Sequence, residues 1–156
     1  MAEAYYEYLM EAMAENKNIY HVDADLGMSI MGQNYFNLLQ KYPNQVVDCG
    51  IQECNMIGVA AGLAATGKIP FAHSFAPFVA RRAADQIFIS GSYSKSNIKV
   101  IGSDPGVMAA FNGGTHMPFE DVAYMRAIPE MTIVEPSDTV CAKELFKEAA
   151  AHYGMF

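Results

Sequence analysis

Carboxylate and aromatic side chains follow several short apolar segments of this chain. Asp23 and Asp25 come after one such segment, Glu53 opens a helix-forming stretch after another, and Phe75 and Phe78 come after a third. Carboxylates accept hydrogen bonds or exchange protons, and aromatic rings stack on planar groups. Ligands of open α/β sheets bind beyond the carboxyl ends of the strands, so these residues are the first candidates for a binding site.

Other common site signatures are missing from the sequence. It contains neither G-x-G-x-x-G nor G-x-x-x-x-G-K-[ST], so we do not expect this chain alone to bind phosphate. The three cysteines, Cys49, Cys54 and Cys141, form no C-x-x-C pair and lie near no histidine at metal-ligand spacing. We predict no metal ligands in the chain and interpret His21 and His73 as structural residues.

The composition is that of a packed globular domain. The chain has 156 residues, of which 52% are hydrophobic and 17% charged, with a formal net charge of −7. This size predicts a single domain over residues 1–156. The negative charge argues against nucleic acid or an anionic membrane surface as a partner. No apolar run approaches the ~20 residues that span a bilayer, so we expect a cytoplasmic protein.

Apolar runs alternate with helix-forming stretches along the chain. We expect helices at residues 2–15, about 29–39, 53–65, about 78–90, 120–126 and from a Ser137 cap to about 152. We expect strands at residues 19–22, 46–49, 69–73, 98–101 and 131–134. This order predicts an α/β fold with a doubly wound, mainly parallel sheet and helices on both faces. A further strand should begin near 153–156, as in a fragment or truncated subunit of a larger enzyme.

Three segments resemble a known family. They are GIQECNMIGVAAGLAATG at 50–67, SFAPFVARRAADQI at 74–87 and NGGTHMPFEDVAYMRAIPEMTIVEPSD at 112–138. Together they resemble the pyrimidine-binding domain of thiamine-diphosphate enzymes of the transketolase family, above all the C-terminal subunit of split bacterial transketolases. The resemblance covers residues 23–138. It implies a transferase of the pentose phosphate pathway that moves a two-carbon ketol unit between sugar phosphates.

In that family, a glutamate at the position of Glu53 hydrogen-bonds the cofactor's aminopyrimidine and promotes loss of the thiazolium C2 proton. Two effects oppose each other at this residue. A helix N-terminus favours the ionised carboxylate, whereas apolar neighbours such as Met56 and Ile57 favour the neutral acid. The residue type alone also fits a glutamate that only complements the helix dipole. The resemblance implies that Glu53 is catalytic and binds the cofactor.

The resemblance also implies roles for three ring side chains. Phe78 matches an aromatic residue that stacks on the aminopyrimidine, and Phe75 lies beside it in the motif. His116 matches a histidine that contacts the sugar substrate, which implies a catalytic and substrate-binding role. By residue type alone, the two phenylalanines also fit the core and His116 fits a solvated loop.

Further substrate contacts are implied less directly. Asp25 and Ser29 match positions near the cofactor and the substrate phosphate, and both also fit helix caps. Asn112 stands where the family often has an aspartate that contacts a substrate hydroxyl. Asp104 replaces a second substrate-facing histidine, and its charge should repel phosphate. A phosphate-binding arginine of the family falls near Ala2 and is missing there.

The resemblance implies that this chain works with a partner. The family holds the diphosphate and its magnesium on a separate domain with a Gly-Asp-Gly motif, which this sequence lacks. We therefore expect a diphosphate-binding domain or N-terminal subunit, in a homodimer or heterotetramer, and an inactive isolated chain. Three alternatives stay open: a domain of 1-deoxyxylulose-5-phosphate synthase, a domain of a 2-oxoacid dehydrogenase β-subunit, and a non-catalytic assembly or regulatory module of the same fold.

Overall fold

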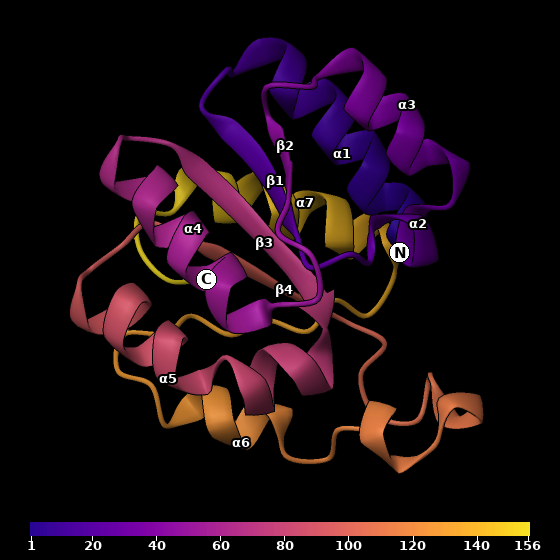
Figure 1. Cartoon of the computed structure of the whole chain (residues 1–156), viewed down its shortest axis with the longest axis vertical. Helices are drawn as coiled ribbons and strands as arrows, with labels where there is room; N and C mark the ends of the chain where they lie inside the picture. Colours follow the sequence, from indigo (N-terminus) through magenta and orange to yellow (C-terminus); the bar gives the residue numbers. More distant parts are fainter.

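A computed structural model describes residues 1–156, and its centre is a four-stranded parallel sheet (Figure 1). The strands are β1 (Ile19–Asp23), β2 (Val46–Asp48), β3 (Ile69–Phe75) and β4 (Lys99–Ser103). Their order is β2-β1-β3-β4. The chain leaves β1 in one direction to form β2 and returns past β1 to form β3. The switch point, where such sheets bind ligands, therefore lies between β1 and β3.

Helices cover both faces of this sheet. One face carries α1 (Ala2–Glu15), α3 (Gln33–Lys41) and α7 (Thr139–Ala151), with the short α2 (Gly27–Met31) beside them (Figure 1). The other carries α4 (Glu53–Ala65), α6 (Asp121–Arg126) and α5 (Ala84–Gln86), which is flanked by the π-helical turns η1 (Phe78–Arg82) and η2 (Ile87–Tyr93). None of the helices is long and apolar enough to span a bilayer. The predicted doubly wound fold is confirmed.

Each face of the sheet has its own apolar core, because successive strand side chains point to opposite faces. Val22 and Ala72 pack toward α4, where they meet Met56 and Ile57. On the other face, Ile19 and Phe71 lie in a second cluster with residues of α1, α3 and α7. Both cores are formed by residues with little or no exposure, so the strand ends are held firmly between two helical layers.

Two predicted helices are interrupted. The helix expected at about 29–39 is broken at Gly32, whose φ of 56° is positive, a conformation that glycine adopts without strain. The helix expected at about 78–90 becomes η1, α5 and η2, because Ala83 leaves the helical conformation at φ −100° and ψ 6°. Within η1, the Arg82 guanidinium carbon lies over the Phe78 ring, 4.7 Å from its centroid.

Two predictions for the last third of the chain are wrong. Residues 131–134 form no strand. They make a single backbone hydrogen bond to the segment after α7, from the Thr132 amide to the Met155 carbonyl, and one such bond does not make a strand pair. The cap of α7 is Asp138 and not Ser137. Its carboxylate accepts a hydrogen bond from the Cys141 amide at 2.8 Å, which satisfies a donor of the first helical turn.

The segment after α7 is held against β4 by a buried lysine. Lys99 Nζ donates to the carbonyls of His152 (2.6 Å) and Gly154 (2.9 Å) and to Asn97 Oδ1 (2.6 Å). The Phe156 carbonyl accepts from the Val100 amide at 2.8 Å, so pairing with β4 begins where a further strand was expected. Burial lowers the pKa of Lys99 to about 8, because the ammonium is fully covered.

This lysine should contribute a stability that increases with pH. The unfolded state binds the Lys99 proton up to pH near 10.5, whereas the folded state loses it near 8. Lys99 should therefore add about 2 kcal/mol to the free energy of unfolding between pH 8 and about 10. Burial raises the pKa of Tyr5 and Tyr8, which acts in the opposite direction near pH 10, so the test compares variants. In urea unfolding, the stability of the native chain relative to Lys99→Met should rise by this amount across the range, whereas its stability relative to Lys17→Met, an exposed control, should stay constant. A constant difference between the native chain and Lys99→Met would contradict the assignment.

Candidate functional site

The carboxylate of Glu53 lies buried at the start of α4. Glu53 is the first residue of this helix and is 1% exposed. Ser74 on β3 donates its hydroxyl to Glu53 Oε1 at 3.3 Å, and Arg82 Nη1 donates to Oε2 at 2.5 Å. The structure therefore combines a helix N-terminus, a hydroxyl and a guanidinium around one carboxylate, all of which stabilise its negative charge.

Three ring side chains form a cluster that Arg82 connects to this carboxylate. Phe75 ends β3, Phe78 begins η1, and His116 comes from η4 (Gly114–His116) in the loop between β4 and α6. The His116 ring lies 5.5 Å from the Phe75 ring and 5.0 Å from the Phe78 ring, both edge to face. Arg82 lies over Phe78 and also bonds Glu53. The structure thus brings together the four site residues for which the sequence predicted the most specific roles.

The loop that carries His116 is attached to η1 by an arginine. Arg81 forms an ion pair with Glu120 and donates to the Met117 carbonyl at 3.2 Å. The pKa of Glu120 lies below its usual value, mainly because its carboxylate accepts a hydrogen bond from Arg81. Arg81 therefore links η1 to the loop that carries His116.

The remaining predicted residues lie on other loops around the same edge. Asp25 and Asp104 follow β1 and β4 and adopt positive φ values of 61° and 51°, which aspartate tolerates better than most residues. Ser29 is exposed on α2, and Asn112 ends the exposed turn η3 (Ala110–Asn112). None of the four makes a hydrogen bond or ion pair with Glu53, so their roles stay predictions.

The helix-cap interpretation of Asp25 and Ser29 is wrong. The first turn of α2 has no side-chain cap of its own. Instead, Asp23 Oδ1 accepts from the Leu26 amide at 3.0 Å, and Asp48 Oδ1 accepts from the Asp25 amide at 3.2 Å. Asp48 also accepts from the Gly50 amide at 2.8 Å, so this residue joins the loops that leave β1 and β2.

Two direct partners of Glu53 were not predicted as site residues. Ser74 faces α4 because it alternates with Phe75 along β3, and that alternation was readable from the sequence. Arg82 was not assigned a role from the sequence. The Arg82 side chain comes close to Glu53 because of the π-helical turn η1, which no residue pattern in the sequence predicts.

The chain matches known proteins along almost its whole length. Residues 1–155 match the family model of the transketolase pyrimidine binding domain. The chain is 46% identical over 154 residues to the 6-deoxy-6-sulfo-D-fructose transketolase subunit SqwH of Clostridium sp. (strain MSTE9), a match that covers 99% of this chain and 47% of that protein. It is 34% identical over 139 residues to a subunit of the apulose-4-phosphate transketolase of Phocaeicola vulgatus, covering 89% of this chain and 44% of that protein.

A solved structure agrees with these relatives. A split gene transketolase, described as an inactive beta4 tetramer, superposes with a TM-score of 0.84 at 38% identity, and the match covers 98% of this chain and 48% of that one. The chain spans about half the length of the curated relatives it matches. Because the family model matches nearly every residue, and the fold agrees with it, this chain belongs to the transketolase family as a pyrimidine-binding domain.

Proposed function

We propose that residues 1–156 form the pyrimidine-binding domain of a thiamine-diphosphate-dependent transketolase that moves a two-carbon ketol unit between sugar phosphates. The observation that supports this best is the surroundings of Glu53. Its carboxylate is 1% exposed at a helix start and accepts from Ser74 and Arg82, and the Arg82 guanidinium lies over the Phe78 ring, against which His116 packs. A buried acid joined in this way to an aromatic ring suits a planar nitrogen heterocycle.

The contacts that Arg82 makes are those that such a ring would need from these residues. Its guanidinium is planar, donates an N–H to Glu53 Oε2 and lies over the face of Phe78. An aminopyrimidine would need the same two contacts, a nitrogen at the carboxyl group and a ring face against an aromatic side chain. The site therefore fits the cofactor. The Arg82 side chain is 47% exposed, so it can turn toward solvent when another group takes these contacts.

When bound, thiamine diphosphate supplies the nucleophilic carbon and electron sink for breaking a C–C bond. In this chain, Glu53 holds the proton shared with the pyrimidine, and Ser74 orients its carboxyl group. Phe78, with Phe75 beside it, fixes the plane of the ring. His116 orients the sugar from the loop side.

Four further residues complete the proposed site. Asp25 lies near the cofactor, and Ser29, Asn112 and Asp104 lie where the substrate enters.

The remaining parts of the active site come from a partner. We propose that a diphosphate-binding domain or N-terminal subunit holds magnesium and the diphosphate, in a homodimer or heterotetramer. The names of two relatives, which are called subunits, support a split enzyme. The cysteines are all unpaired, which is the state expected in the reducing cytoplasm, so we propose that location.

A steady-state assay of this chain mixed with its diphosphate-binding partner tests the proposal. We expect turnover with xylulose 5-phosphate and ribose 5-phosphate, and none with the chain alone. Turnover with pyruvate as the donor would indicate the synthase or the 2-oxoacid dehydrogenase class. A folded, correctly assembled complex that turns over no donor would identify a non-catalytic assembly module.

A second candidate for the donor is a sulfonated sugar. The relative SqwH is named for 6-deoxy-6-sulfo-D-fructose, and it shares 46% of its residues with this chain over the match. Asp104 puts a carboxylate at the sheet edge, at the position where the family resemblance implies a histidine. The assay with 6-deoxy-6-sulfo-D-fructose as donor, run beside xylulose 5-phosphate, distinguishes the two substrates.

Removing this carboxylate should favour phosphorylated substrates. In the assembled enzyme, Asp104→Asn should lower the KM for xylulose 5-phosphate by about fivefold with little change in kcat, because repulsion between the carboxylate and the phosphate is lost. Asp85→Asn, on the exposed side of α5, is the matched control. An unchanged KM in Asp104→Asn would show that this side chain does not face the phosphate.

Replacing the buried acid should stop cofactor activation without removing the cofactor. Glu53→Gln keeps the size and hydrogen-bonding ability of the side chain but cannot take up or release the proton. We expect the assembled enzyme to exchange the C2 hydrogen of thiamine diphosphate at least about a hundredfold more slowly, with binding nearly unchanged. NMR after acid quench measures the exchange, and Glu15→Gln is the control. Native exchange rates in Glu53→Gln would disprove the assignment.

A further inference from the structure

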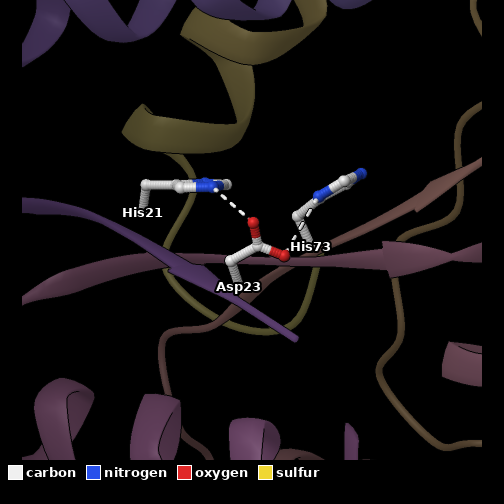
Figure 2. Close-up of side chains that lie close together, drawn as sticks. All are labelled: His21, Asp23 and His73. Carbon is white, nitrogen blue, oxygen red and sulfur yellow. Dashed lines mark ion pairs between the residues drawn. The ribbon is translucent and has the colours of Figure 1, made fainter. Parts of the chain in front are cut away.

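Three ionisable side chains lie together in the sheet, on the face covered by α1 and α3. His21 and Asp23 are two residues apart on β1 and so point to the same face, and His73 on β3 stands opposite Asp23 in the strand register. Figure 2 shows the two imidazole rings on either side of the Asp23 carboxylate. All three residues are 0% exposed.

Each of these side chains has one polar atom without a hydrogen-bond partner. The atoms are His21 Nε2, Asp23 Oδ2 and His73 Nδ1. His21 Nε2 lies 3.7 Å from Asp23 Oδ2, and His73 Nδ1 lies 3.9 Å from Asp23 Oδ1. Both separations are too long for a hydrogen bond. Unpaired polar atoms in a fully buried place destabilise a fold, so this group requires an explanation.

Contacts on the outer side of His73 determine which way its lone pair points. His73 Nε2 lies 3.2 Å from Ser103 Oγ, and this hydroxyl donates to the Ser74 carbonyl at 3.4 Å. Since the hydroxyl has one proton and gives it to Ser74, it accepts from His73 Nε2–H. The neutral His73 ring therefore directs the lone pair of Nδ1 toward Asp23. His21 is also held from outside, by Tyr5 OH at 3.0 Å from Nδ1.

A lone pair that faces a carboxylate needs a cation between them. A proton on the imidazole would draw nitrogen and oxygen to about 2.8 Å. Two atoms bound to one tetrahedral metal ion lie about 3.3 Å apart, closer to the observed 3.7 and 3.9 Å. This geometry favours a metal ion over a proton.

We propose that His21, Asp23 and His73 bind one divalent transition-metal ion, most readily Zn²⁺, as a structural site beneath the carboxyl edge of the sheet. Two imidazole nitrogens and a carboxylate are a donor set that suits Zn²⁺ and Co²⁺. The ligand atoms all lie within 4.8 Å of one another, so small side-chain rotations bring them onto one ion. The second oxygen of Asp23 can supply a fourth ligand atom.

The backbone of α2 closes this site from outside. A Cβ atom at Gly27 would lie 2.6 Å from Asp23 Oδ2 and 2.2 Å from the Tyr35 ring, so only glycine allows this approach. An ion bound here is enclosed by protein and should exchange slowly. It must enter as the chain folds, and the test therefore begins from unfolded protein.

The experiment is to refold the full chain with excess Zn²⁺ or Co²⁺, desalt it, and measure the bound metal. We expect about one ion per chain by elemental analysis, and visible absorption bands of a tetrahedral nitrogen and oxygen site with Co²⁺. His21→Gln and His73→Gln should retain at least about tenfold less metal. His152→Gln, which changes an exposed histidine, should retain as much as the native chain.

A milder variant keeps the test valid if the ligand variants do not fold. Ser103→Ala leaves all three ligands in place but removes the partner that orients His73. Competition with a chelator should show about tenfold weaker binding in this variant, with an unchanged circular dichroism spectrum. Native protein that holds no ion after refolding, or His73→Gln that retains as much as native, would overturn the proposal. Neither result depends on transketolase activity.

Discussion

The parallel pairing of β1 with β3 is the constraint on which the site depends. In this register Asp23 stands opposite His73, so Ser74 and Phe75 follow in fixed positions at the switch point of the sheet. Ser74 points to α4 and meets Glu53, whereas His73 points to the opposite face. A slip of one residue would exchange these faces and separate Ser74 from its carboxylate.

Three buried charged groups are stabilised in different ways in this small fold. Glu53 has a guanidinium, a hydroxyl and a helix start around it. Lys99 donates to two carbonyls and an amide oxygen, which makes it a structural support for the last residues. The Asp23 carboxylate accepts one hydrogen bond, from the Leu26 amide, and the nearest nitrogens of the two imidazoles are too far away to donate to it. The first two groups are satisfied by the protein itself, and the third is not.

The order of elements up to β4 was predictable from sequence, because apolar runs and helix-forming stretches alternate regularly there, whereas the apolar run at 131–134 forms no strand. Glu53 and Phe78 could be named as candidate site residues because they lie within segments that resemble a known family, and the structure connects them through Arg82. The break at Gly32 and the π-helical turns were not predictable, since a glycine or alanine is compatible with a continuous helix. The group around Asp23 was also hidden, because strand pairing and not sequence spacing brings His73 to it.

A short series of contacts connects the two faces of the sheet. Ser74 donates its hydroxyl to Glu53, while its carbonyl accepts from Ser103, whose hydroxyl oxygen lies 3.2 Å from His73 Nε2. An ion bound by His73 would therefore hold the ends of β3 and β4 in the positions that orient the partner of Glu53. Precise positioning of an acid requires such a second layer of rigid contacts. With such an ion, His73 would act on the proposed cofactor site through geometry, and the proton chemistry proposed for Glu53 would not involve it.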